Sequence, residues 1–282
     1  MASKFPYDPA TDTTPNMSLA RRSAVVALAI IPATFLTLPL VALLARAPWQ
    51  RAGALLSSGA VVQSLRLTII CSLTATVLSV LGGLPLSWVL AKRNLPLLPV
   101  VRALIILPVV LPPVVGGVAL LLAFGRNGVA GQFLDRWFGV RLPFTTAGAI
   151  LAETFVAMPF FVLSMEGAFA TADQRLSDVA ATLGAPPLRT FTSVLFPSLR
   201  TPFFAAAVLA WARALGEFGA TITFAGSFPG VSQTMPLSVY REFERDPEAA
   251  IMLSLVLVVL SLVVLVATGR RAFSPLKKSS TR

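Results

Sequence analysis

Three charged residues lie inside otherwise apolar stretches of the sequence: Glu153, Arg213 and Glu217. A charge at the centre of a bilayer costs about 2.5–3.5 kcal/mol on insertion scales, so such residues are usually paired or functional. Arg213 and Glu217 are four residues apart, so on a helix they share one face and can neutralise each other, with Glu153 as another partner for Arg213. The sequence leaves two interpretations open: a structural ion pair, or an arginine that eases an anion along a pathway while Glu217 holds it. Glu166 lies near the end of an apolar stretch and is expected to reach the interface.

Prolines and glycines interrupt a second apolar stretch, "ILPVVLPPVVGGVALLLAFGRNG", which runs from residue 106 to 128. Each interior proline removes a helical hydrogen bond, and the freed carbonyls are tolerated in lipid only where protein or a water-filled cavity satisfies them. Two interpretations remain here as well: a packing kink between helices, or a kink beside a translocation pathway that acts as a gate. The candidate gate residues are Pro108, Pro112, Pro113 and Gly116, to which Arg213 and Glu217 are added as candidate pathway residues.

A third stretch, around residues 171–200, is too polar to span a bilayer and too regular to be a plain loop. Thr171–Gln174 fits a capping box that starts a helix, and Gly184 followed by two prolines would end that helix in a left-handed cap. A helix this short is marginal alone, so its apolar stripe must dock on its own membrane domain or on a partner. The stripe recurs at helical spacing: Leu176, Val179, Ala180 and Leu183.

The composition identifies the class of protein that must position these residues. The 282 residues are 56% hydrophobic and only 12% charged, which is typical of a polytopic membrane protein and not of a soluble domain. The net charge of +11 fits cytoplasmic loops rich in Lys and Arg, so no nucleic-acid partner is expected. Histidine is absent and Cys71 is the single cysteine, which excludes a Cys/His metal site and leaves a membrane enzyme without its usual catalytic groups. No lysine follows a glycine as in a phosphate-binding loop, so if ATP is used another chain must bind it.

Six apolar stretches are long enough to cross a bilayer, which predicts an all-α, multi-pass protein with both termini on one side. Their approximate bounds are Ala24–Ala45, Ser64–Ala91, Ala103–Phe124, Thr145–Phe169, Pro202–Phe224 and Ala249–Thr268. With the amino terminus inside, the inner segments hold fourteen Lys and Arg residues and the outer segments hold seven. The positive-inside rule therefore predicts that both termini, and the segment 171–200, are cytoplasmic.

The predicted organisation follows from these spans. Residues 1–20 are expected to be a disordered cytoplasmic tail, 21–63 the first transmembrane helix with its outer loop, 64–268 the main transmembrane domain, and 269–282 a basic cytoplasmic tail. The outer segment between the last two spans mixes both charge signs around Arg241 and Arg245. It could dock an outer protein or be a solvated loop.

The segment "DVAATLGAPPLRTFTSVLFP", residues 178–197, resembles the E-A-A-x3-G-x9-I-x-L-P loop of permease subunits in type I ATP-binding-cassette importers. The spacing matches at every position, with conservative departures such as Asp for Glu and Val for the first Ala. In that family the loop forms a coupling helix, between the fourth and fifth spans, that docks on a cytoplasmic ATPase. The resemblance implies this role for Asp178, Val179, Ala180, Leu183, Gly184 and Pro197.

Residues 106–128 and "ARALGEFGATITFAGSFPGVSQTMPLSVY", residues 212–240, are similar to the permeases of molybdate and tungstate importers, with sulfate/thiosulfate permeases as close relatives. The resemblance implies a non-catalytic subunit of the bacterial cytoplasmic membrane that works as a homodimer. Two cytoplasmic ATPases, which carry ATP and Mg²⁺, and an outer substrate-binding protein would complete it. No cofactor is expected in this chain. An ATP-independent channel or transporter and a membrane enzyme remain the alternatives from other classes.

Overall fold

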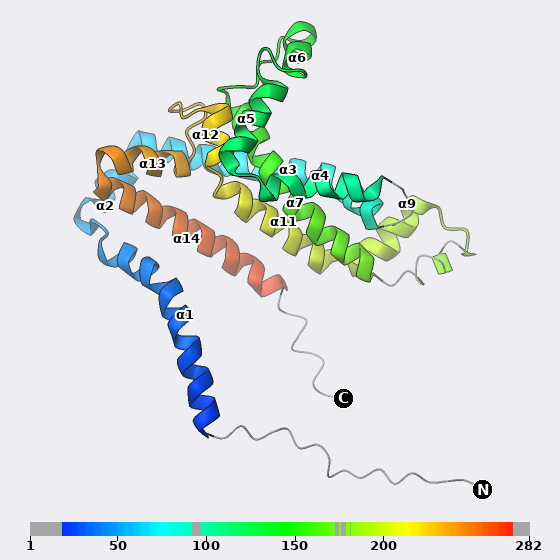
Figure 1. Cartoon of the computed structure of the whole chain (residues 1–282), viewed down its shortest axis with the longest axis horizontal. Helices are drawn as coiled ribbons and strands as arrows, with labels where there is room; N and C mark the ends of the chain where they lie inside the picture. Colours follow the sequence, from blue (N-terminus) through cyan, green and yellow to red (C-terminus); the bar gives the residue numbers. More distant parts are fainter. Residues whose placement is uncertain (1–18, 92–96, 173–174, 176–178, 181, 273–282) are drawn as a thin grey trace. The chain divides into compact units, whose positions relative to one another are not determined.

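The computed structural model describes residues 19–91, 97–172, 175, 179–180 and 182–272, and every regular element in these ranges is helical (Figure 1). The all-α prediction is confirmed. The elements are α1 (Leu19–Ala45), the short η2 (Trp49–Arg51) and α2 (Ala52–Leu56), α3 (Gly59–Ala91), α4 (Leu98–Val110), α5 (Pro113–Phe124), α6 (Gly131–Phe138), α7 (Thr146–Thr171), α9 (Pro187–Thr190), the π-helical η3 (Phe191–Leu195), α10 (Phe196–Ser198), α11 (Arg200–Leu215), α12 (Gly219–Ala225), α13 (Met235–Arg245) and α14 (Pro247–Ala272).

The chain forms two compact units, residues 1–47 and 48–282. The first contains α1, whose described side chains, from residue 27 to 45, are exposed except for the partly buried Leu43; the exposed ones include Leu28, Ile31 and Phe35. The predicted tails lie mostly outside the described residues. α1 already begins at Leu19 and α14 continues to Ala272, so both terminal helices extend slightly beyond the predicted boundaries.

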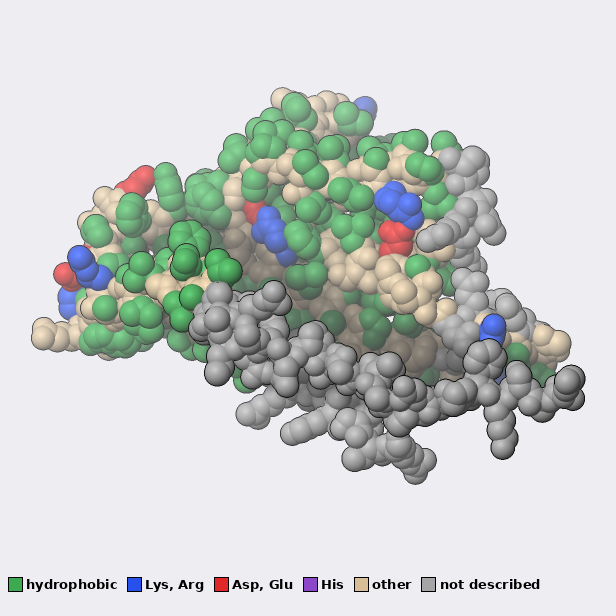
Figure 2. Space-filling model, turned by 60° about the horizontal axis from the view of Figure 1, so that its bottom comes forward, with side chains coloured by type: hydrophobic (Ala, Val, Ile, Leu, Met, Phe, Trp, Pro, Cys, Tyr) green, Lys and Arg blue, Asp and Glu red, His purple; other side chains and the backbone are tan. Residues whose placement is uncertain are grey.

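Four helical stretches among the described residues are long and apolar enough to cross a membrane: Ala27–Ala45, Gly59–Ala91, Thr146–Thr171 and Pro247–Val266. Two sharply bent helix pairs raise the number to six if each pair is one span. The pairs are Leu98–Val110 with Pro113–Phe124, and Phe191–Ser198 with Arg200–Leu215. This upper figure agrees with the predicted number of spans. A membrane-spanning protein needs a largely apolar surface. In Figure 2, hydrophobic side chains cover much of the visible face and charged side chains are few.

The third and fifth predicted spans are not continuous helices. In place of a continuous helix over Ala103–Phe124, the chain bends by 120° between α4 and α5. Leu111 and Pro112 are extended at the junction, because consecutive prolines cannot continue the hydrogen-bond pattern of α4. In place of Pro202–Phe224, α11 ends at Leu215 and α12 begins at Gly219.

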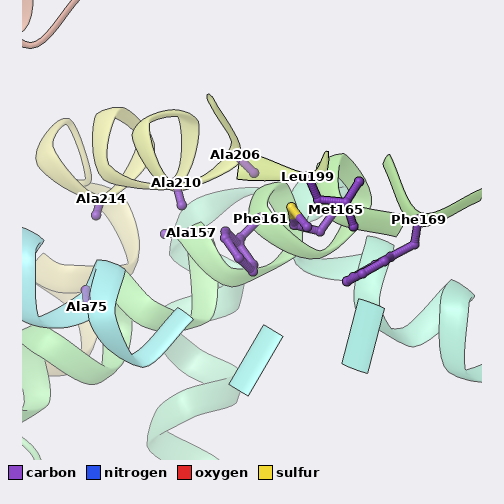
Figure 3. Packing of buried hydrophobic residues seen from close by; sticks show 9 residues of the cluster. All are labelled: Ala75, Ala157, Phe161, Met165, Phe169, Leu199, Ala206, Ala210 and Ala214. Atoms are coloured by element: carbon purple, nitrogen blue, oxygen red, sulfur yellow. The ribbon is translucent and has the colours of Figure 1, made fainter. Parts of the chain in front are cut away.

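The core of the second unit lies where α3, α7 and α11 pack together (Figure 3). Ala206, Ala210 and Ala214 follow one another at four-residue spacing along α11, so a single small-residue stripe faces the neighbouring helices. Phe161 and Met165 of α7 fill the space that the alanines leave, and both side chains are fully buried. Small residues allow close helix approach, which replaces the hydrophobic driving force that is missing in lipid.

Candidate functional site

The break between α11 and α12 contains the predicted ion pair. Arg213 lies in the last turn of α11, while Glu217 follows the end of that helix. Their side chains form an ion pair of 2.7 Å between Nη2 and Oε2. The pairing is confirmed, but the reason differs from the prediction, because the two residues do not share one continuous helix.

Glu217 has a second task at this break. Its Oε1 accepts a hydrogen bond of 2.9 Å from the backbone N–H of Ala220, in the first turn of α12. The first N–H groups of a helix have no partner within the helix, and the positive end of the helix dipole favours an anion there. Glu217 therefore stabilises the start of α12 with one oxygen and holds Arg213 with the other.

The ion pair is asymmetric in its exposure. Only 1% of the Glu217 side chain is accessible, whereas Arg213 retains 28%. The Arg213 guanidinium also lies 6.0 Å from the ring centroid of Phe160 on α7, a cation–π distance that the sequence did not suggest. Arg213 is thus held by a carboxylate and an aromatic ring, while its side chain as a whole stays partly exposed.

Glu153 of α7 is also buried, but its surroundings differ from those predicted. It interacts electrostatically with Glu217 and with Cys71 of α3. Its Oε2 has no hydrogen-bond partner among the described residues, and neither has the hydroxyl of Thr221 on α12. Among these residues the carboxylate that pairs with Arg213 is that of Glu217, so the suggested Glu153–Arg213 pair is wrong.

The proline-rich bend and the ion pair are brought together by packing of α5 on α12. A Cβ at Gly219 would lie 2.6 Å from Cβ of Pro113, and a Cβ at Gly117 would lie 2.5 Å from Cβ of Thr223. Neither position has room for a side chain. Gly116 instead faces α7, where a Cβ would lie 3.2 Å from Phe155. Pro108 remains inside α4, while Pro112 and Pro113 form the start of α5.

The segment predicted to be outer, between α12 and α14, is not a plain solvated loop. Ser232, Gln233 and Thr234 are buried, and the chain then forms α13. The N–H of Met235 donates to the Thr68 hydroxyl at 2.7 Å, which ties α13 to α3. A ring contact of 5.1 Å between Tyr240 and Phe218 connects α13 to the residue beside Glu217.

An exposed ionic cluster fixes the start of α14. Arg51 contacts Asp246 and Glu248, each at 2.7 Å. The hydrogen bond from Arg51 and one from the N–H of Ala249 hold the pKa of Asp246 below its ordinary value.

The segment predicted to be cytoplasmic, residues 171–200, is described only in part, and Asp178 lies outside the described residues. Gly184 adopts φ 76°, the left-handed conformation predicted for the cap. The N–H of Ala185 bonds to the carbonyl of Ala180 at 3.0 Å, a bond that closes a helix end. Ala180 is buried, whereas Val179 and Leu183 are 58% and 82% exposed.

The predicted capping box at Thr171–Gln174 needs correction. Thr171 is the last residue of α7, and its hydroxyl donates to the carbonyls of Gly167 and Ala168 within that helix. The remaining residues of the box, Asp173 and Gln174, lie outside the described residues. Pro197 lies in the short α10, which leads into α11.

These features define a multi-pass helical membrane protein with a short helical segment between two of its spans. The family model described as "Binding-protein-dependent transport system inner membrane component" matches residues 83–278, and the chain belongs to this family. It is therefore a multi-pass inner membrane protein of the transport-permease class.

Several individual proteins are similar to it. The "Molybdenum transport system permease protein ModB" of Mycobacterium tuberculosis is 46% identical over 243 residues, which cover 86% of this chain and 92% of that protein. A protein of the same name from Haemophilus influenzae is 41% identical over 201 residues, 69% of this chain and 87% of that protein. A probable sulfate transport system permease, cysT of Chlorokybus atmophyticus, is 32% identical over 238 residues, 82% of each chain.

Solved structures agree on the fold. A chain of a bacterial alginate ABC transporter, in complex with a periplasmic protein bound to an alginate pentasaccharide, matches with a TM-score of 0.69. The match covers 91% of this chain and 96% of that chain at 16% identity. An inward-facing MetNI methionine ABC transporter matches with a TM-score of 0.61 at 18% identity, covering 76% of this chain and 95% of that chain.

Proposed function

We propose that this chain is the permease subunit of an ATP-driven importer that moves molybdate or tungstate across the cytoplasmic membrane. The observation that carries the substrate class is the 46% identity to a molybdenum permease over nearly its full length. Sulfate is the second candidate, because a probable sulfate permease matches over a similar range at 32% identity.

The working assembly contains two copies of this chain, two cytoplasmic ATPases and an outer substrate-binding protein. The sequence has no phosphate-binding loop, so ATP and Mg²⁺ are bound on the ATPases. A closed two-fold dimer is the commonest assembly of identical chains. The apolar side chains exposed along α1 support a helix that lipid or a second copy covers.

The cytoplasmic segment 171–200 couples ATP hydrolysis to transport. Val179 and Leu183 project from a short helix that Gly184 ends, so they offer an apolar edge that its own chain leaves exposed. Docking of this edge on the ATPase would transmit its closure to the membrane domain. The two membrane halves would then open outward to the loaded binding protein, and hydrolysis would reset them inward.

Arg213 lies beside the path of the oxyanion and contributes a fixed positive charge. Its partial exposure supports this role, since Glu217 and Phe160 hold the guanidinium while 28% of the Arg213 side chain stays accessible. The bend at Pro112 and Pro113 packs next to this break and acts as part of the gate. A low-dielectric pathway needs such a charge, because an anion loses its hydration there.

Both termini and the coupling segment face the cytoplasm in this proposal. Single cysteines at Leu183 and Val129, in a Cys71→Ala background, test it because both side chains are more than four-fifths exposed. An impermeant thiol reagent applied outside intact cells should label position 129 and not position 183. Labelling of both positions from one side would contradict the orientation.

The transport function is tested by reconstitution in liposomes. Liposomes that carry the chain, its ATPase and its binding protein should accumulate labelled molybdate when ATP is enclosed on the side of the membrane where the ATPase lies. Omission of any one component should abolish uptake. Tungstate should compete strongly and sulfate weakly. Equal competition by sulfate would favour the sulfate alternative, and uptake without the ATPase would contradict an ATP-driven importer.

A further inference from the structure

An apolar groove of about 290 Å³ lies between α3, α4, α5 and α7, in the crook of the 120° bend. Ile105 and Pro108 line it from before the bend, and Leu120 and Phe124 line it from after the bend. The bend therefore creates the groove, because one chain segment supplies two walls that meet at an angle.

The longest wall is a single face of α7. Its residues recur at helical spacing: Leu151, Thr154, Phe155, Met158, Pro159 and Val162. The hydroxyl of Thr154 donates to the carbonyl of Ile150 at 2.7 Å, so the polar group of this wall is already satisfied. The groove consequently suits a hydrocarbon ligand and offers nothing to a polar one.

The length of this wall corresponds to one leaflet of a membrane. Leu151 and Val162 are eleven residues apart, which is about 16 Å along a helix. The hydrocarbon core of a bilayer is about 30 Å thick, so the wall covers roughly half of it.

An ion pair closes one end of the groove. Arg102 lies one turn before Ile105 on α4, and Glu166 lies one turn beyond Val162 on α7. The two side chains are bonded to each other, and they retain 41% and 14% exposure. The expectation that Glu166 simply reaches the interface was incomplete, because it has a specific partner. A positive and a negative group are thus fixed side by side where the groove ends.

We propose that this groove binds one acyl chain of a zwitterionic phospholipid of the phosphatidylethanolamine type. The phosphate would lie at Arg102 and the ammonium at Glu166. The lipid would belong to the leaflet next to the coupling segment, because α7 runs from the groove through Glu166 to its end at Thr171. The apolar lining, the one-leaflet length and the pair of opposite charges all fit this ligand. Since the groove joins both arms of the bent pair to α7, an acyl chain in it would stabilise the bend.

A photoreactive phosphatidylethanolamine with a diazirine in the middle of one acyl chain tests the proposal. The full-length protein, assembled with its partners in liposomes that contain this probe, is irradiated, and labelled peptides are mapped by mass spectrometry. Labelling should concentrate on the groove face of α7 and on α4 around Ile105. Met158→Trp fills the groove and should reduce this labelling at least tenfold. Leu262→Trp, on an exposed face of α14, is the matched control and should leave it unchanged.

Competition distinguishes the possible ligands. Unlabelled phosphatidylethanolamine should displace the probe, phosphatidylglycerol should displace it less, and water-soluble glycerophosphoethanolamine should not displace it. Arg102→Gln combined with Glu166→Gln should remove the preference between the first two lipids.

Three outcomes would overturn the proposal. They are labelling as strong on α14 as in the groove, groove labelling that Met158→Trp does not reduce, and crosslinking of a photoreactive residue at position 158 to a second copy of the chain. If Met158→Trp does not accumulate, Leu151→Phe blocks the other end of the same wall and gives the same comparison.

Discussion

Replacement of Arg213 should destabilise the protein more than neutralisation of Glu217, although both changes break the same ion pair. Arg213→Met removes the cation that pairs with Glu217, whose side chain is only 1% exposed. The Glu217 carboxylate then keeps the hydrogen bond from the N–H of Ala220 but has lost its ion-pair partner. Glu217→Gln leaves an arginine that is 28% exposed and can turn towards the surface. The glutamine oxygen can still accept the bond from Ala220, so the start of α12 stays capped.

The magnitudes follow from this asymmetry. Removal of one partner from a buried ion pair costs about 3–5 kcal/mol, and this applies to Arg213→Met. The loss of a charge-assisted hydrogen bond costs about 1.5–3 kcal/mol, and partial exposure of Arg213 reduces that for Glu217→Gln to about 1–2 kcal/mol. The double variant, Arg213→Met combined with Glu217→Gln, has no stranded charge and should lie within about 1 kcal/mol of the wild type. At about 2–4 °C per kcal/mol, Arg213→Met should lower Tm by roughly 10 °C.

Thermal unfolding of the purified, lipid-reconstituted variants measures these differences. Arg102→Met is a matched control, because its partner Glu166 is more exposed than Glu217, and it should cost less than Arg213→Met. Equal losses for Arg213→Met and Glu217→Gln would refute the argument from burial. Uptake of labelled molybdate by the double variant then tests the pathway role. Stability should return without uptake, and normal uptake by the well-folded double variant would rule out an essential role for Arg213.

Three further predictions use the local geometry. Gly184→Val should abolish stimulation of the ATPase by loaded binding protein, because a β-branched residue resists positive φ. Gly139→Val is the control, since Gly139 has φ 63° in an equally open site, and this variant should leave stimulation intact. Equal effects of the two variants would contradict a coupling role for Gly184. Gly117→Ala should cost about 1–3 kcal/mol in thermal unfolding through its clash with α12, whereas Gly167→Ala, with open space around it, should be neutral or stabilising. Because folding lowers the pKa of Asp246, its ionised carboxylate stabilises the folded protein at any pH above the ordinary pKa of 3.8. This stabilisation is lost as the pH falls through the lowered pKa. The difference in Tm between wild type and Asp246→Asn should therefore be constant from pH 5 to 8 and shrink below about pH 4, and a difference that persists at low pH would contradict this.

The fold class, the interruption at Pro112 and Pro113 and the helix end at Gly184 were predictable from the sequence because they depend on neighbouring residues, whereas the break between α11 and α12 was not predicted. Long apolar stretches are sufficient to predict membrane helices, since a helix satisfies its backbone groups within itself. Gly184 ends a helix through its own conformational freedom, and two consecutive prolines interrupt one through their missing N–H groups. The attraction between Arg213 and Glu217 was also local enough to predict.

The tertiary structure decided what depends on contacts between distant segments. Hydropathy does not distinguish a side chain that faces lipid from one that faces another helix, so the burial of Ser232 and the exposure of Arg213 could not be predicted. A proline pair predicts an interruption, but the 120° angle is set by the packing of α5 on α12 through Gly117. The partner of Glu166 is 64 residues away, on a helix that only folding brings alongside α7. Sequence therefore determined the helical class and the break at the proline pair, while packing determined the break between α11 and α12, the directions of the helices and the meeting of Arg102 with Glu166.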